Sequence, residues 1–290
     1  MKENKTVLEK TIATLNHSYG YRIYDPNISV TDRQRILDEI TPIVLQRVSA
    51  KDLTEHTNTV YNDTADAYAK EPHNQHIIDE LVLFIHMLSD GARVLDVGCG
   101  TGRDSFFMAI YYDDSSRYHK MQRKKDGLKT IDKFRIPTKK FEVTGIDSSP
   151  AMLKLANKNH RFNNPNFRLG DMHNLEPDLK DFDGIWSCTS LFTHTPLSML
   201  DEAMRGVSLA LKQRGIFFTS YTCGDRQNYD KLKISSTGRI KYFSQPSPEH
   251  IAEIAKNHGL ILKAQSFDDF EVDGKTIKEN LFVSQFFKKK

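Results

Sequence analysis

Cysteine, tryptophan and long apolar runs are scarce in this sequence. Its 290 residues include three cysteines and one tryptophan. The cysteines are far apart and odd in number, so their spacing suits neither a disulfide framework nor a metal site. The most apolar run, LVLFIHML at residues 81–88, is too short to cross a bilayer, and the start MKENKTVLEK has no apolar signal core. We therefore expect a cytoplasmic protein that has no metal site and no membrane segment.

Net charge is also small, at +3, so the total gives no strong electrostatic reason to expect nucleic-acid binding. Two segments depart from the rest of the chain. Residues 1–56 contain helix-like pieces that Pro42 is expected to break, and we predict an N-terminal helical extension or lid there. Residues 112–140 are rich in lysine and arginine and are expected to form an insertion. The main domain would then cover residues 57–290.

From residue 92 onward, short β-rich runs alternate with helical stretches, which is the pattern of βαβ units in a parallel sheet. The expected strands are 93–97, 141–146, 166–169, 182–187, 215–221, 260–266 and 281–287. A helix should start at the Ser-Ser-Pro of residues 148–150, and another should run over about 248–258 and end at Gly259. We expect a third helix to stop at Gly215, with Lys212 and Arg214 near its negative end.

The stretch RVLDVGCGTGRD, residues 93–104, places three glycines directly after the first strand. Glycines at Gly98, Gly100 and Gly102 would let a nucleotide-type ligand lie close to the backbone. A dinucleotide fingerprint needs a small residue where Arg103 stands, and the G-K-[ST] of a phosphate-binding loop is absent. A phosphate-free, cationic ligand such as S-adenosylmethionine fits better, because the carboxylate of Asp96 is close to the glycines.

These residues resemble motif I of the class I S-adenosylmethionine-dependent methyltransferases, through VLDVGCGTG at residues 94–102. The resemblance extends over about residues 61–287 and is closest to small-molecule and tellurite-resistance-type members. Its further blocks are VYNDTADAYAK, VTGID, FRLGDM, FDGIWSC and LFTHTP. It implies a Rossmann-like α/β fold with a mostly parallel seven-stranded sheet in the order 3-2-1-4-5-7-6, strand 7 antiparallel, and helices on both faces.

The resemblance also implies S-adenosylmethionine as cofactor and assigns roles by position. Asp147 would accept from both ribose hydroxyls, Asp171 from the adenine amino group, and Met172 would pack on the adenine ring. Ser187 and Cys188 lie at the end of the fourth strand and are site candidates, whereas Trp186 is expected in the core. The predicted cofactor-binding residues are Asp96, Gly98, Cys99, Gly100, Gly102, Asp147, Ser148, Asp171, Met172, Ser187 and Cys188.

The interval between Gly100 and Asp147 is much longer than the usual twenty or so residues. The basic insertion accounts for the excess if it leaves the sheet undisturbed, whereas a hidden strand within it would remove the ribose role of Asp147.

Three residues are predicted to contact the methyl acceptor. His194 could contact the acceptor or act as a general base, although a structural histidine at a helix start is an equal alternative. His173 is a weaker candidate for the base. Tyr68 lies seven residues after Tyr61, so the two tyrosines share a helical face. Tyr221, at the end of the fifth strand, completes the predicted substrate site.

The acceptor itself stays open at this level. No N/D-P-P-Y/F run follows the fourth strand, which favours a small molecule over a base amine or glutamine. The basic segment 117–140 would suit an RNA acceptor, such as tRNA or an mRNA cap, but a solvated loop is the simpler interpretation. Two further classes of protein stay open. One is a non-catalytic S-adenosylmethionine-binding protein, with residues 1–56 holding a partner, and the second is a nicotinamide-dependent oxidoreductase, which Arg103 disfavours.

Overall fold

The computed structural model describes residues 5–19, 23–25, 27–70, 75–110, 139–159, 164–223, 229–235, 237–268, 271–272, 275–276 and 282–290. Most of the predicted basic insertion therefore lies outside the described residues.

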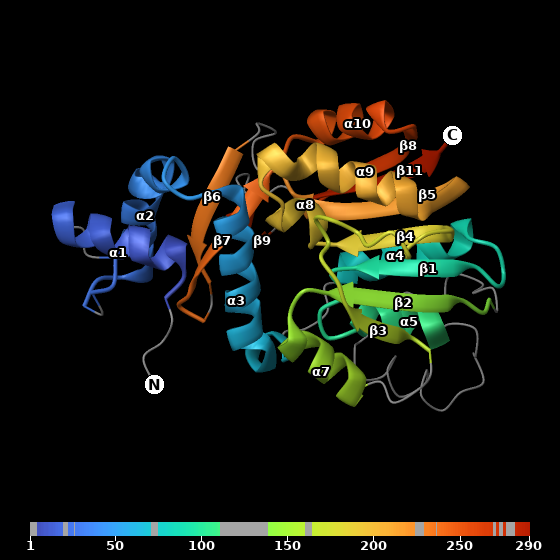
Figure 1. The fold of residues 1–290 in the computed structure, drawn as a ribbon, viewed down its shortest axis with the longest axis horizontal. Coiled ribbons are helices and arrows are strands. Elements are labelled where there is room, and N and C mark those ends of the chain that lie inside the picture. Colours follow the sequence, from blue (N-terminus) through green and yellow to red (C-terminus); the bar gives the residue numbers. More distant parts are fainter. Residues whose placement is uncertain are drawn as a thin grey trace.

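A seven-stranded sheet forms the centre of the molecule (Figure 1), in the order β3-β2-β1-β4-β5-β11-β8. Its strands are β1 (Arg93–Val97), β2 (Glu142–Asp147), β3 (Asn166–Leu169), β4 (Phe182–Cys188), β5 (Leu211–Thr222), β8 (Leu260–Asp268) and β11 (Phe282–Lys289). The first five pair in parallel, and β11 is antiparallel to both β5 and β8. This confirms the predicted order, since β8 and β11 are the sixth and seventh strands of the prediction. Because β2 pairs directly with β1, no strand separates Asp147 from the glycines.

The sheet is covered on both faces by helices, as predicted. The helices of this domain are α4 (Gln75–Met87), α5 (Arg103–Ile110), α7 (Pro150–Asn159), α8 (Leu191–His194), α9 (Leu200–Ala210) and α10 (Pro248–Asn257). Alternate residues of β5 enter two separate cores: Phe217 packs with α9 and α10, whereas Phe218 packs with α4. This alternation follows from the two-residue repeat of a strand and explains the apolar runs of the sheet. Trp186 is fully buried beside Phe218, as expected for a core residue.

Two sequence predictions about helices were wrong. The helix expected to stop at Gly215 ends at Ala210, and the chain enters β5 at once. Lys212 therefore does not face a helix end but pairs with Asp183, at 2.8 Å. Gly215 permits a tight bend, because a Cβ there would lie 2.9 Å from the carbonyl oxygen of Lys212.

The second error concerns Pro42. It lies inside α2 (Val30–Leu45) and does not break the helix. Proline costs the helix one backbone hydrogen bond, because it lacks an N–H. The apolar residues near it hold the helix in place, since Leu37, Ile40 and Val44 are all fully buried. Tertiary packing here outweighs the local preference.

A cap lies beside the sheet. It consists of the N-terminal helices α1 (Val7–Tyr19), α2 and α3 (Ala50–Tyr68) and of a hairpin from later in the chain, β6 (Tyr229–Ile234) with β7 (Ile240–Gln245). The sequence did not predict that hairpin. Its residues Leu232, Ile240 and Tyr242 share one apolar core with the N-terminal helices. In Figure 1, α3 runs from the hairpin down to α7. The predicted division at residues 56 and 57 falls within α3, and the division into domains stays a prediction.

Two short strands, β9 (Glu271–Val272) and β10 (Lys275–Thr276), pair with each other. A 3₁₀ turn, η2 (Leu197–Met199), precedes α9. Among the described residues, none of the helices has the length and apolar character needed to span a bilayer.

Candidate functional site

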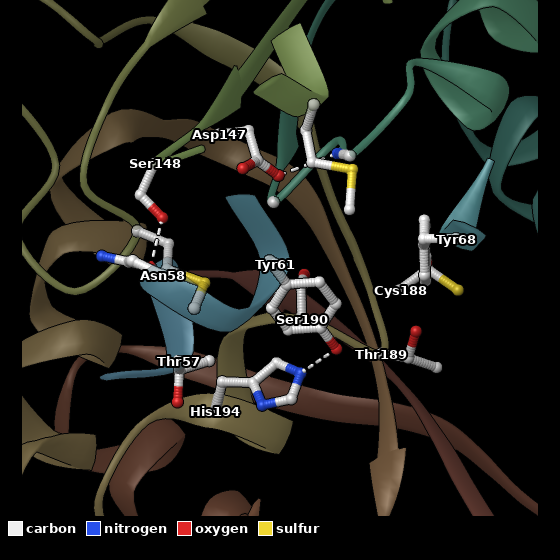
Figure 2. Close-up of a pocket in the computed structure, with 14 residues that line it drawn as sticks. Thr57, Asn58, Tyr61, Tyr68, Asp147, Ser148, Cys188, Thr189, Ser190 and His194 are labelled. Atoms are coloured by element: carbon white, nitrogen blue, oxygen red, sulfur yellow. Dashed lines mark hydrogen bonds between the residues drawn. The ribbon is translucent and has the colours of Figure 1, made fainter. Parts of the chain in front are cut away.

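A pocket opens where β1, β2 and β4 end, at the side of the sheet that faces α3 (Figure 2). It encloses about 550 Å³ of empty space, with the open solvent at its mouth included. Its described lining residues are Thr57, Asn58, Tyr61, Tyr68, Gly98, Gly100, Asp147, Ser148, Met152, Met172, Cys188, Thr189, Ser190 and His194. Ligands of parallel α/β sheets bind at this carboxyl edge, so the pocket is where the strand pattern predicted a site.

The glycine loop after β1 is shaped by backbone needs as well as by any ligand. Gly98, Gly100 and Gly102 all have positive φ, at 74°, 54° and 79°. A Cβ on Gly98 would lie 2.4 Å from the Cβ of Ser190, so the loop and the start of α8 can meet only at a glycine. At Gly100 the nearest atom to such a Cβ is 3.6 Å away, on Tyr68. Gly100 therefore leaves room on the pocket side.

Asp147 ends β2 inside the pocket. Its Oδ2 accepts a hydrogen bond of 2.9 Å from the N–H of Gly100, and its Oδ1 accepts one of 2.8 Å from the N–H of Ser149. Burial raises the pKa of this carboxyl, although both backbone bonds lower it. The two bonds fix the carboxylate and leave each oxygen a further lone pair, which suits a ligand with two hydroxyl groups.

Asp96 lies beneath the glycine loop and does not line the pocket. It is 2% exposed, and its Oδ2 accepts a hydrogen bond of 2.5 Å from Ser105 Oγ. Burial and repulsion from Asp104 and Asp147 raise the pKa of Asp96 well above its usual range. A positive charge bound nearby would relieve this repulsion.

The remaining predicted cofactor residues fall into two groups. Met172 and Ser148 line the pocket, and Ser148 Oγ donates a 2.6 Å hydrogen bond to Asn58 of α3. Asp171 lies just before Met172, is half exposed, and accepts from both the N–H and Nδ1 of His173 at 2.9 Å. Cys188 also lines the pocket, whereas Asp171, Cys99, Gly102 and Ser187 are outside the lining.

Ser187 and Tyr221 were predicted for the site because they are at strand ends, but their hydroxyls are buried elsewhere. Ser187 Oγ lies 2.9 Å from Ser190 Oγ and accepts from the N–H of Leu191, so it holds the start of α8. Tyr221 is fully buried and donates to Gln285 at 2.8 Å, so it faces the core. Neither lines the pocket.

His194 is brought together with Tyr61 rather than with Tyr221. Tyr61 Oη lies 2.8 Å from His194 Nε2, and His194 Nδ1 lies 3.2 Å from the carbonyl oxygen of Tyr242 in β7. Burial, and then the charge of Lys241, lower the pKa of His194 to about 3. The imidazole is therefore neutral at physiological pH.

Six lining residues were absent from the predicted site. They are Thr57, Asn58, Tyr61, Met152, Thr189 and Ser190. The first three belong to α3, and their position over the sheet depends on tertiary contacts. Asn62 on the same helix accepts from the N–H of Ala151 at 3.0 Å, which fastens α3 to the start of α7. Thr189 has a φ of 50°, the kind of strained non-glycine backbone that gathers at functional sites.

No cationic side chain occurs among the described residues that line the pocket. Within the described ranges, no group of three or more His, Cys, Asp or Glu side chains is arranged to hold a metal ion. The lining thus offers hydroxyls, backbone amides, one carboxylate and apolar surfaces. These groups favour a ligand without phosphate.

Comparison with known proteins gives one family and several shared folds. A family model described as a methyltransferase domain matches residues 88–259, which is more than half of the chain. No match is found among curated proteins.

Solved structures share the fold at low identity. The CcbJ methyltransferase from Streptomyces caelestis has a TM-score of 0.52 and 19% identity, with 80% of this chain and 98% of that chain covered. The 1,6-didemethyltoxoflavin-N1-methyltransferase from Burkholderia thailandensis, with that compound and S-adenosylhomocysteine bound, has a TM-score of 0.51 and 14% identity, with 83% and 91% covered. A complex of DhpI with S-adenosylhomocysteine has a TM-score of 0.52 and 18% identity, with 82% of this chain and 97% of that chain covered.

Proposed function

Since the chain belongs to the class I methyltransferases through this domain, we propose that it transfers a methyl group from S-adenosylmethionine to a small-molecule acceptor. One observation carries the proposal. The glycine loop after β1 and the acid at the end of β2 are joined by the Gly100–Asp147 hydrogen bond within one pocket. That pocket has a carboxylate and no described cationic lining, which suits a cationic, phosphate-free ligand.

The residues fit S-adenosylmethionine on the chemistry of their donors and acceptors. Asp147 has two fixed carboxylate oxygens for the ribose hydroxyls, and Gly100 leaves the backbone open beside it. Met152 and Met172 supply apolar surface for a flat ring. A sulfonium or ammonium group bound above the loop would favour the ionised form of Asp96, which burial and the neighbouring acids otherwise disfavour. Two of the solved structures with the same fold contain the demethylated product.

What the protein adds to the chemistry is chiefly position and exclusion of water. S-adenosylmethionine supplies a methyl carbon that is already activated by its bond to a sulfonium. With the cofactor bound, the acceptor's lone pair would displace the sulfide from that carbon, the electron pair of the carbon–sulfur bond would stay on sulfur, and the acceptor's proton would pass to solvent when the products leave. Holding both reactants in line supplies much of the rate. The cap helix α3 covers the pocket with Tyr61 and Thr57 and so limits the access of water.

A small acceptor is favoured over RNA by the surroundings of the pocket. Tyr61 from α3 and His194 from α8 line it, and β7 lies directly behind His194. One structure of the same fold is described as a methyltransferase of 1,6-didemethyltoxoflavin, a small molecule. The basic segment proposed for RNA, residues 117–140, lies almost wholly outside the described residues. RNA methylation is the second candidate, and the lysine and arginine content of that segment is what supports it.

The acceptor class can be tested with S-adenosylmethionine that carries a labelled methyl group. The protein is incubated with a cell extract divided by a filter that retains nucleic acid and protein. We expect the filtrate to contain a labelled compound that chromatography separates from S-adenosylmethionine, and we expect that compound to be absent with Asp147→Asn. Label found only in ribonuclease-sensitive material would replace the small-molecule proposal by the RNA one. Binding of S-adenosylmethionine without label transfer in any fraction would favour a non-catalytic binding protein.

A further inference from the structure

The hydrogen bonds of His194 determine which way the hydroxyl of Tyr61 points. A backbone carbonyl can only accept, so the contact between His194 Nδ1 and the oxygen of Tyr242 requires a proton on Nδ1. In a neutral imidazole the other nitrogen then carries the lone pair. His194 Nε2 therefore accepts, and Tyr61 donates its single hydroxyl proton to it at 2.8 Å.

Burial keeps His194 in this neutral form. The side chain is 4% exposed, and the groups that face it are Tyr61 from α3, Lys241 and Tyr242 from β7, and His173 from the loop after β3. The positive charge of Lys241 disfavours an imidazolium, and none of these groups supplies a carboxylate to stabilise one. His194 therefore accepts a hydrogen bond from Tyr61 and does not act as a general base that takes up a proton.

The ring of Tyr61 is fixed from several sides. Lys241 Nζ lies 4.2 Å from the centre of the ring, and the rings of His194 and Tyr68 approach it edge-on at 5.1 and 5.9 Å. Phe243 of β7 packs against the far side of His194, at 5.3 Å. The pair, whose hydrogen bond is drawn in Figure 2, is therefore held by the cap hairpin and the cap helix together.

From this geometry we propose that Tyr61 is a catalytic residue that accepts a hydrogen bond from the reacting N–H or O–H group of the methyl acceptor, and that His194 is the positioning residue that orients it. With its proton donated to His194, the phenolic oxygen can offer a ligand only lone pairs. The complementary acceptor is then an amine or a hydroxyl compound, because a thioether or a carbanion has no such proton. The inference rests on the proposed function and deepens it, since Tyr61 lines the same pocket as Gly98 and Asp147.

The tautomer of His194 can be measured without any acceptor. In protein labelled with ¹⁵N-histidine, long-range ¹H–¹⁵N spectra separate the two neutral tautomers and the imidazolium. His194→Gln assigns the resonance, and Tyr61→Phe keeps the ring but removes the hydroxyl. We expect the Nδ1–H tautomer between about pH 5 and about pH 8, with a change in the Nε2 shift in Tyr61→Phe. An Nε2–H tautomer would turn the Tyr61 hydroxyl toward the pocket and overturn the proposal.

A matched pair of probes tests the polarity of the acceptor. Phenol carries an O–H donor, and anisole is the same ring with that hydrogen replaced by methyl. Titrated into the protein with S-adenosylhomocysteine present, phenol should bind about fivefold more tightly than anisole, the worth of one hydrogen bond. Tyr61→Phe should abolish that preference. Equal binding of both probes to the unaltered protein, or no binding of either, would contradict a donor-bearing acceptor.

The proposed function and the role of Tyr61 fail in different ways. Calorimetry with S-adenosylmethionine on the unaltered protein tests the proposed function, whereas the tautomer of His194 tests the role of Tyr61. Loss of cofactor binding in the unaltered protein would refute the proposed function, whereas the wrong tautomer with intact binding would refute only the role of Tyr61.

Discussion

The backbone N–H of Gly100 donates a hydrogen bond of 2.9 Å to Oδ2 of Asp147. The two residues are 47 positions apart in the sequence. This contact joins the loop after β1 to the end of β2, together with the bonds that the N–H groups of Gly98 and Cys99 donate to the carbonyl oxygen of Ile146. The long interval between them therefore does not displace the acid. The hydrogen bond aligns the carboxylate of Asp147 with the glycine loop, at the edge of the sheet where ligands bind.

Gly98 should be the least replaceable glycine of the loop for stability. In Gly98→Ala the new Cβ would lie 2.4 Å from Ser190 Cβ, at a φ of 74°. We expect a loss of about 2–4 kcal/mol in the free energy of unfolding. Gly91→Ala is the control, because Gly91 has a φ of 75° but nothing within 4 Å of an added Cβ. It should cost only about 1–2 kcal/mol. Urea denaturation measures both, and equal losses would contradict the steric role of Ser190.

Asp96 should make the folded protein less stable as pH rises. Burial and neighbouring acids raise its pKa in the folded state, so the folded chain binds more protons than the unfolded one. Stability then falls as pH rises from about 4, the unfolded value, through the higher folded pKa. Asp96→Asn should flatten that decline in thermal unfolding followed between about pH 4 and about pH 8.

Asp171 serves as a control, because its pKa in the folded state is lowered whereas that of Asp96 is raised. Burial acts to raise its pKa, but the hydrogen bonds from His173 outweigh this and lower it. Its stabilisation is therefore present above the unfolded pKa and lost as pH falls. Asp171→Asn should reduce the loss of stability as pH falls below the unfolded pKa. It should leave unchanged the decline that Asp96 causes as pH rises. The same pH profile for both variants would show that Asp96 does not carry a raised pKa.

The cap should depend on Arg239, which comes directly before β7. Its guanidinium contacts Asp63 of α3 at 2.9 Å and Glu9 of α1 at 3.0 Å. Since these pairs are partly exposed, Arg239→Ala should cost only about 1–2 kcal/mol. We expect faster hydrogen exchange in α1 and the hairpin, with the central sheet unchanged. Arg205→Ala, which removes an exposed pair with Glu202 on α9, is the control and should not affect the cap.

Much of the sheet could be predicted from the sequence because most of its strands contain β-rich runs bounded by turn residues. The predicted β1 and β3 have the observed bounds, and the ends of β2 and β4 differ by one residue. The end of α9 could not be predicted, since Lys212 and Arg214 suit a helix terminus equally well. What decides the outcome is pairing with β4, through Phe182 and Leu211, which the local sequence does not contain.

The candidate site was predictable where residues follow a strand directly. Gly98, Gly100, Asp147 and Cys188 were placed in the pocket by that rule, and all four line it. The lining residues from the cap could not be predicted, because Tyr61 reaches the pocket only when α3 packs across the sheet. The hairpin behind His194 carried the signal of alternating residues, with Ile240 and Tyr242 on the apolar face and Lys241 on the other.

Binding of S-adenosylmethionine measured by isothermal titration calorimetry tests the central claim most directly. We predict binding of S-adenosylmethionine and of its demethylated product, but not of NAD. We also predict that Asp147→Asn weakens the affinity by about tenfold or more, the worth of hydrogen bonds to a charged group. Asp201→Asn, an exposed acid outside the pocket lining, should have no effect. Absence of S-adenosylmethionine binding at millimolar concentration, or equal affinity in Asp147→Asn, would contradict the proposed cofactor site.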